Sequence, residues 1–130
     1  MLAKEVVIDA SALAAFLFAE EGGQAVVAKL GRSQMVAPSL LPYELSSVCF
    51  KKMRKEPARS EAFRAALQGY VDMPVELVDL TPLAVLQNVE LFKLSAYDAA
   101  YLCLAMQRNA QLITLDADLG KAAKKLGLLA

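Results

Sequence analysis

Four short apolar segments alternate with longer helical patterns along this chain, and this alternation restricts the fold more than any other feature. Each segment is rich in Val, Ile or Leu and is followed by a change to helical periodicity. The segments comprise residues 5–8, 34–37, 75–79 and 111–115. We expect helices over residues 11–20, 23–30, 42–55, 58–71, 82–92, 96–109 and 119–126. Strands that are apolar on both faces and separated by helices predict an α/β fold, in which helices pack on both sides of a parallel sheet.

The composition is that of a globular protein with a hydrophobic core. Apolar residues make up 57% of the 130, which is enough for a single compact domain. The longest apolar segment without a charge, residues 10–19, is too short to cross a bilayer, which takes about 20 residues. We therefore expect a soluble, cytoplasmic protein without a membrane partner. Cys49 and Cys103 lie in apolar helical patterns without CxxC spacing, which predicts free, buried thiols.

The chain has no histidine, and this excludes several kinds of chemistry. Zinc sites built on imidazole, Ser-His-Asp triads and histidine general bases all require that side chain. The net charge is zero, so the overall charge does not indicate a nucleic-acid partner. Basic residues nevertheless gather in the middle of the chain and near its end. They are Lys51, Lys52, Arg54, Lys55, Arg59 and Arg64, followed by Lys121, Lys124 and Lys125. Each group is either a solvated helix face or a surface that contacts phosphates.

Acidic residues occur where three of the predicted strands lead into helices. Asp9 follows the first strand, Glu44 lies in the first turn of the helix after the second, and Asp116 follows the last. Loops after parallel strands emerge at one edge of the sheet, and Asp98 joins them if its helix also begins there. Each acid can instead be a helix-start residue, and Ser95 with Asp98 matches a capping box. Several carboxylates at one edge repel each other unless a cation lies between them, and Mg²⁺ or Mn²⁺ prefers such an all-oxygen site.

Four segments carry a family resemblance that extends over nearly the whole chain. They are "VVIDASAL", "APSLLPYELSSVCFKKMRK", "LSAYDAAYLCLAMQ" and "QLITLDADLGKAAKKLGL", in this order. With these segments the sequence resembles PIN-domain ribonucleases, specifically the VapC toxins of toxin–antitoxin pairs. The resemblance implies a PIN-like three-layer α/β/α sandwich around a central, mostly parallel sheet of four or five strands. It also implies that residues 58–73 form the second half of a helical hairpin and that the last strand is short or incomplete.

The resemblance also implies the active-site residues and their chemistry. The acidic quartet of the family falls on Asp9, Glu44, Asp98 and Asp116. Mg²⁺ or Mn²⁺ would be held by Asp9, Asp98 and Asp116, with Asp118 as an additional acid. Glu44 would be a further ligand or a base that orients water, and Ser11 and Thr114 occupy positions where the family commonly has orienting hydroxyls. Hydrolysis of RNA by a metal-activated water would leave a 5′-phosphate and a 3′-hydroxyl.

The expected substrate is single-stranded or looped RNA, because an A-form duplex hides its base edges in a deep, narrow groove. The candidate contacts to its backbone are Lys51, Lys52, Arg54 and Lys55. The expected protein partners are a cognate antitoxin, which would direct a basic side chain at the acids, and a second copy of the chain in a homodimer.

Two other functions remain open. A receiver-like signalling domain also gathers aspartates at a sheet edge, but it has paired acids after the first strand and a lysine after the last, whereas Ala10 and Ser11 follow Asp9 here. A catalytically silent RNA- or protein-binding module of the PIN fold would share every feature of the sequence, since the residues show ligands and not turnover. Cleavage of RNA with Mg²⁺ or Mn²⁺, compared with EDTA, would separate the nuclease from both alternatives.

Overall fold

A computed structural model describes residues 3–130 and contains one four-stranded sheet in the order β3-β2-β1-β4. The strands are β1 (Glu5–Ile8), β2 (Gln34–Pro38), β3 (Val75–Val78) and β4 (Gln111–Ile113). Every neighbouring pair is parallel, so the expected parallel sheet is confirmed with four strands. The segment after the last helix adds a single parallel bridge, between Leu112 and Leu129, in place of a fifth strand.

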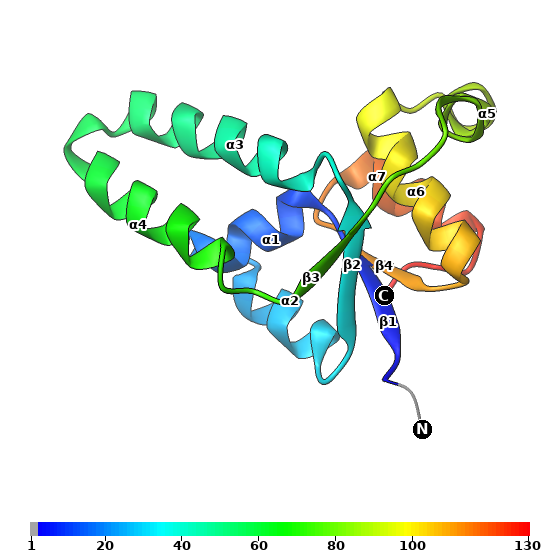
Figure 1. The fold of residues 1–130 in the computed structure, drawn as a ribbon, viewed down its shortest axis with the longest axis horizontal. Helices are drawn as coiled ribbons and strands as arrows, with labels where there is room; N and C mark the ends of the chain where they lie inside the picture. The colour runs from blue at the N-terminus through cyan, green and yellow to red at the C-terminus, as the bar shows by residue number, and fades with distance from the viewer. Residues whose placement is uncertain (1–2) are drawn as a thin grey trace.

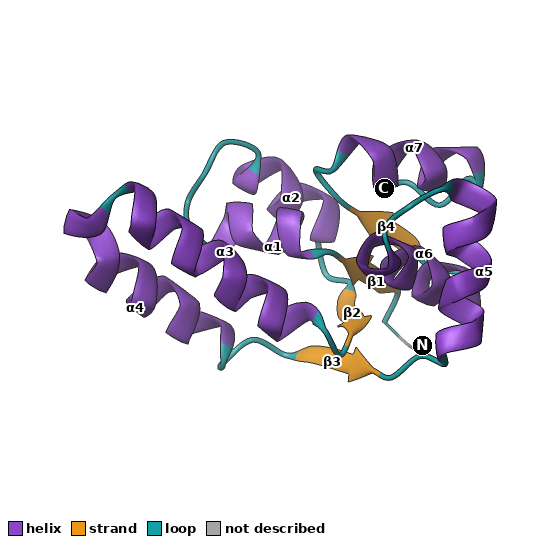
Figure 2. Ribbon diagram, turned by 90° about the horizontal axis from the view of Figure 1, so that it is seen from above, coloured by secondary structure: helices purple, strands orange, loops and turns teal. Residues whose placement is uncertain are grey.

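The helices cover both faces of this sheet. They are α1 (Ala10–Leu17), α2 (Gly23–Leu30), α3 (Leu41–Lys55), α4 (Ser60–Tyr70), α5 (Pro82–Phe92), α6 (Ala96–Arg108) and α7 (Ala117–Lys125), with a 3₁₀ turn at Pro57–Arg59. Figure 2 shows α1 to α4 on one side of the sheet and α5 to α7 on the other. The three-layer α/β/α sandwich is therefore confirmed. Helices α3 and α4 form the expected hairpin, which projects away from the sheet on the left of Figure 1.

The core lies on both faces of β1, β2 and β4, where α1 and α6 cover the sheet. Val7, Ile8 and Val36 are completely buried there, which is why these strands are apolar along their whole length. Both cysteines are free and buried, as their apolar surroundings predict. Among the described residues, no helix combines the length and the apolar character that crossing a bilayer requires.

Strand β3 differs from the expectation that every strand is buried on both faces. It is an edge strand whose only neighbour within residues 3–130 is β2, and within it Glu76 is exposed and Leu77 keeps 42% of its surface accessible. Its Val and Leu residues resemble those of a central strand, but it also contains Glu76, and the order of strands places it at the margin of the sheet. The sequence pattern is local, whereas cover by helices depends on the whole topology.

Two glycines allow the tight connection between α1 and α2. Gly22 has φ 91°, a left-handed conformation that favours glycine, and a Cβ on Gly23 would lie 2.6 Å from the carbonyl oxygen of Ala15. The helix predicted to reach residue 20 accordingly ends at Leu17. This turn brings α2 back along α1 and leaves the start of α1 at the carboxyl edge of the sheet, beside β4.

Candidate active site

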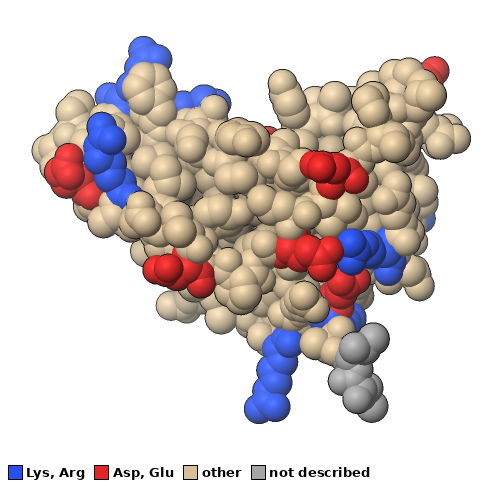
Figure 3. Space-filling view, in the orientation of Figure 1, with Lys and Arg blue, Asp and Glu red and all other residues tan. Residues whose placement is uncertain are grey.

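The carboxyl ends of the strands meet at one edge of the sheet, and four acidic residues lie there. Asp9 connects β1 to α1, Glu44 is in the first turn of α3, Asp98 is in the first turn of α6, and Asp116 precedes α7. In the space-filling view this edge is hollowed between the α3 side and the α5–α6 side, and acidic atoms are visible at the bottom of the hollow (Figure 3). The topology thus brings together four acids that are up to 107 positions apart in the numbering, from Asp9 to Asp116.

Asp9 is the most deeply buried of these acids, with 3% of its surface exposed. Its Oδ1 accepts hydrogen bonds from the Ser11 hydroxyl (2.7 Å) and the backbone N–H of Ala12 (2.9 Å), and its Oδ2 accepts one from the Thr114 hydroxyl (2.5 Å). Burial raises the pKa of Asp9, the three hydrogen bonds oppose this rise, and the charge of Asp116 adds to it. The side chain is therefore both the N-cap of α1 and a member of the acidic group.

The two hydroxyls predicted to orient the acids connect separate segments of the chain. Ser11 Oγ accepts a hydrogen bond from the backbone N–H of Leu115 (2.9 Å), and Thr114 Oγ1 accepts one from that of Asp116 (3.0 Å). Asp116 in turn caps α7 by accepting from the backbone N–H of Leu119 (2.8 Å). These bonds fix the turn between β4 and α7 against the start of α1. They also explain why β4 ends at Ile113, two residues earlier than its sequence predicts.

Asp98 belongs to a capped helix start and to the acidic group at the same time. Its backbone N–H donates to the hydroxyl of Ser95 (3.1 Å), which is half of the predicted capping box. Burial raises the pKa of its carboxyl group, and the charges of Asp116, Asp9 and Asp118 raise it further, partly opposed by the Ser95 hydroxyl. Asp118 lies in the first turn of α7 and is exposed at the margin of the group. The two interpretations of Asp98 are therefore compatible.

Glu44 has a partner that the sequence analysis missed. The hydroxyl of Tyr101, a residue of α6 with 1% of its surface exposed, donates to Oε1 of Glu44 over 2.6 Å. Burial raises the pKa of Glu44, this hydrogen bond lowers it, and the charges of Asp9 and Asp98 raise it. Tyr101 lies in an apolar pattern typical of core residues. Its position three residues after Asp98, on the same face of the helix, is the signal that points it toward the acids.

The donor set suits a divalent cation, although the side chains do not yet converge on one point. In their present conformations, no three Asp, Glu or Cys side chains within residues 3–130 form a group that could hold a metal ion. Both oxygens of Asp9 are engaged, as is one oxygen each of Asp116 and Glu44. Four carboxylates with only oxygen donors fit Mg²⁺ or Mn²⁺, and a cation would relieve their mutual repulsion.

The four basic residues proposed to contact RNA line one cavity beside α1, but they differ in their contacts. Lys51 lines a cavity of about 450 Å³ together with Glu44, and Lys55 is exposed one turn further along α3. Lys52 is less accessible, since it forms an ion pair with Glu20 and lies over the ring of Phe18. Arg54 lies over the ring of Phe50, 5.8 Å from its centroid. Lys51 is therefore the one of these four residues that shares the cavity of Glu44.

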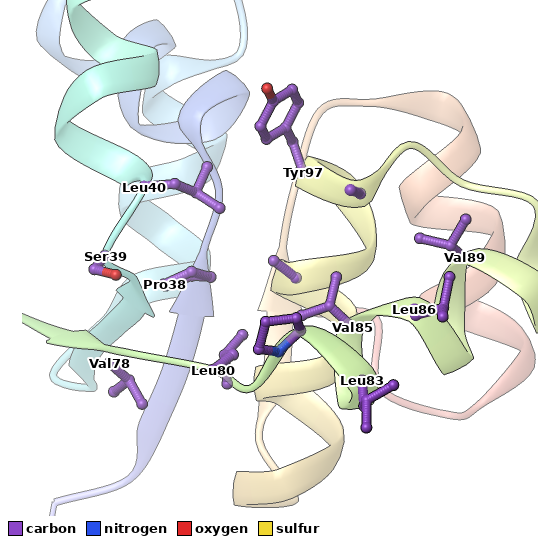
Figure 4. Close-up of a pocket in the computed structure, with 13 residues that line it drawn as sticks. Pro38, Ser39, Leu40, Val78, Leu80, Leu83, Val85, Leu86, Val89 and Tyr97 are labelled. Atoms are coloured by element: carbon purple, nitrogen blue, oxygen red, sulfur yellow. The ribbon is translucent and has the colours of Figure 1, made fainter.

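A second, apolar cavity of about 620 Å³ adjoins the acidic one. It lies between the ends of β2 and β3 and the helices α5 and α6, and Leu80, Val85 and Leu86 line it (Figure 4). Leu40 and Tyr97 border both cavities, and Figure 4 shows them on opposite sides of the gap between α3 and α6. The acidic edge thus continues into an apolar surface on the α5 side.

Comparison with known proteins gives a family and a set of solved structures with the same fold. Residues 6–125 match the family model of the PIN domain. No curated protein matches the chain. The structure of PAE2754 from Pyrobaculum aerophilum has a TM-score of 0.72 and 24% identity, and the match covers 91% of this chain and 78% of that one.

Two further solved structures share the fold at lower identity. VapC20 from Mycobacterium tuberculosis, described as a toxin that cleaves the sarcin–ricin loop, matches with a TM-score of 0.61 and 17% identity over 90% of this chain and 94% of its own. VapBC2 from Rickettsia felis, bound to a DNA fragment from its promoter, matches with a TM-score of 0.62 and 15% identity over 96% and 95%. At these identities the likeness concerns the fold.

Proposed function

The chain belongs to the PIN domain family, and from that premise we propose that it is a metal-dependent endoribonuclease, the toxin of a VapBC-type toxin–antitoxin pair. One observation carries this proposal. Asp9, Glu44, Asp98 and Asp116 come from four separate segments and lie close enough for their charges to raise one another's pKa at three of the four positions. Such repulsion destabilises a fold, and the bound cation of a nuclease would remove it.

We assign the metal to Asp9, Asp98 and Asp116, with Asp118 at its margin. A bound Mg²⁺ or Mn²⁺ would supply positive charge next to the phosphodiester and would lower the pKa of a water molecule. Ser11 and Thr114 hold the carboxylate of Asp9 in place from two sides.

Glu44 is the candidate base that orients water and accepts its proton. Burial and the neighbouring acids keep its pKa above the ordinary value, and this favours proton uptake. Tyr101 positions Glu44 through its hydroxyl. Attack by water and departure of the 3′-oxygen would leave a 5′-phosphate and a 3′-hydroxyl.

The proposed nuclease function also implies a substrate and protein partners. The substrate is single-stranded or looped RNA in the cytoplasm, and Lys51, Lys52, Arg54 and Lys55 are the candidate contacts to its backbone. A cognate antitoxin would restrain the nuclease, as the toxin–antitoxin composition of the neighbouring VapBC2 structure suggests. We also propose that the chain is a single domain and forms a homodimer. The exposed apolar side chains beside the acidic edge, such as Leu83 (79% exposed), are available for protein contacts.

Cleavage of a mixed RNA pool by purified protein free of antitoxin tests this function. We expect cleavage with Mg²⁺ or Mn²⁺ and none in EDTA, with products that carry 5′-phosphates when their ends are mapped. Asp116→Asn should reduce the rate at least about a hundredfold, because it removes a charge that the metal requires. Asp72→Asn makes the same chemical change at an exposed position between α4 and β3 and should leave the rate unchanged.

Two results would contradict the proposal in different ways. Cleavage in EDTA would exclude the metal-dependent mechanism. RNA binding without cleavage under any metal condition would instead favour the catalytically silent module of the same fold.

A further inference from the structure

Two exposed tyrosines stand directly beside the acids. Tyr43 precedes Glu44 in α3 and is 76% exposed, and Tyr97 precedes Asp98 in α6 and is 64% exposed. Both line the cavity of about 450 Å³ that also contains Glu44. Within residues 3–130, neither hydroxyl has a hydrogen-bond partner, so neither ring is retained there by a structural contact of its polar end.

The two rings come from opposite sides of the cleft. Tyr43 belongs to the α3 side and Tyr97 to the α6 side, and the ring of Tyr97 stands at the upper rim of the apolar cavity in Figure 4. Both residues lie in the first turn of a helix, and the backbone N–H of Tyr43 is bonded to the carbonyl of Leu40 (3.1 Å). Because both backbones are held in a helix, little backbone conformational entropy is lost when a ligand packs on the rings.

The charge of the cleft explains why a nuclease would need such rings. The chain has no net charge, and the acidic group repels the phosphates of a nucleic acid. Lys51 is the basic side chain that lines the same cavity. Base stacking on aromatic side chains is independent of charge, and it contributes substantially to single-strand binding because every base has a π-face.

We propose that Tyr43 and Tyr97 are stacking platforms that hold two unpaired bases of an RNA strand beside the phosphate presented to Glu44 and Asp98. This inference rests on the proposed ribonuclease function and names the residues that position its substrate. In this arrangement the acids lie at the phosphate that is cut, Lys51 contacts a neighbouring phosphate, and each of the two rings stacks on a base. A duplex cannot use this site, because its bases are already stacked and paired.

Tyrosine fluorescence makes the proposal directly measurable. The chain has no tryptophan and four tyrosines, of which Tyr70 is half-buried and Tyr101 is buried. A single-stranded RNA of about ten nucleotides, within the usual range of single-strand sites, is titrated into Asp116→Asn protein in Mg²⁺, which keeps the RNA intact. We expect stacking to quench the tyrosine emission as the anisotropy of labelled RNA rises. In the double variant Tyr43→Phe/Tyr97→Phe the RNA should still bind, but the quenching should be largely lost.

Leucine variants separate stacking from simple apolar contact. Tyr43→Leu and Tyr97→Leu in the same background should each weaken RNA binding about tenfold, whereas the corresponding phenylalanine variants should bind as tightly as the parent. Phe16→Leu is the matched control, since Phe16 is 44% exposed at the end of α1 remote from Asp9. It should leave RNA affinity unchanged.

The outcomes distinguish failure of this inference from failure of the proposed function. If wild-type protein cuts RNA but the leucine variants bind RNA as tightly as the parent, the stacking role is wrong and the nuclease stands. If the leucine variants change the sedimentation coefficient and not RNA affinity, the rings contact a second copy of the chain, which also overturns the inference. If no variant binds RNA and wild type does not cut it, both proposals fall.

Discussion

Asp9 is buried more completely than a helix cap requires. Capping needs one oxygen that accepts a backbone N–H, and Ala12 supplies that contact. The second oxygen is held by Thr114, and the whole residue is only 3% exposed. Removing a carboxylate from water is unfavourable, and the hydroxyls of Ser11 and Thr114 offset this cost only in part, because the pKa of Asp9 stays raised. A carboxylate held against such a cost is typical of a functional position.

Asp98→Asn tests whether this repulsion extends to α6. Burial and the neighbouring acids raise the pKa of Asp98 above its ordinary value, so its ionisation destabilises the fold. Metal-free wild-type protein should therefore lose stability as the pH rises from about 4 through the raised pKa, and Asp98→Asn should lose less. Thermal melts of both proteins in EDTA, between about pH 4 and pH 8, measure the difference. If Asp98 is a metal ligand as proposed, Mg²⁺ should raise the melting temperature of wild type more than that of the variant, which would have one ligand fewer.

The cap at the start of α6 supplies the control for this experiment. Ser95→Ala removes only the hydroxyl that accepts from the backbone N–H of Asp98, which costs about 1 kcal/mol. That loss should be nearly the same with and without Mg²⁺. If Asp98→Asn behaves in the same way, with a lower melting temperature at every pH and an unchanged Mg²⁺ effect, Asp98 serves the helix cap and not the acidic site.

At the scale of elements, the sequence predicts which elements exist better than where they end. All four strands and all seven helices within residues 3–130 lie at their expected places, because local periodicity determines them. Ends depend on contacts with distant segments. Strand β4 stops at Ile113 because Thr114 turns to bond Asp9, and α1 stops at Leu17 because α2 must return past Ala15.

The candidate site likewise combines features that the local sequence predicts with contacts that it does not. The acids could be placed at one edge because each follows a strand or begins a helix in a parallel sheet. The hydrogen bond from Tyr101 to Glu44 joins residues 57 positions apart and depends on how α6 packs beside α3. Likewise, the pairing of Lys52 with Glu20 depends on the approach of α3 to the end of α1. Patterns within one segment contain no information about such partners.

Two glycines in different helices give opposite predictions for the same substitution. Gly23→Ala should destabilise the protein by about 1–3 kcal/mol, because the new Cβ would lie 2.6 Å from the backbone oxygen of Ala15. Gly69→Ala in α4 should stabilise it by up to about 1 kcal/mol, because nothing lies within 4 Å and alanine favours the helix. Denaturant unfolding of both variants measures the two signs. A Gly23→Ala protein as stable as wild type would show that α2 can move away from α1 at little cost.

The whole molecule combines zero net charge with an uneven distribution of charge. The four acids of the candidate site lie together at the carboxyl edge of the sheet. Several Lys and Arg side chains lie over the α3–α4 hairpin on the left of Figure 3, with acidic side chains among them. Lys51 and Lys55 lie one turn apart on α3, are exposed, and form no ion pair within residues 3–130. A strand that leaves the acidic cleft past Lys51 would next meet Lys55 along the same helix face. If the chain binds RNA as proposed, the attraction should be local and detectable as counterion release from this face alone.

Removing the charges of Lys51 and Lys55 should make RNA binding less sensitive to salt. Each phosphate contact in a single strand contributes about 0.7 to the slope of log K against log salt concentration, so Lys51→Ala/Lys55→Ala should reduce the slope by about 1.4. Lys124→Ala/Lys125→Ala removes the same charge from the end of α7 and should leave the slope unchanged. Binding of a short single-stranded RNA to Asp116→Asn protein, measured at several salt concentrations, compares the two pairs. Equal decreases in both pairs would mean that RNA responds to total charge, and the α3 face would then have no special role.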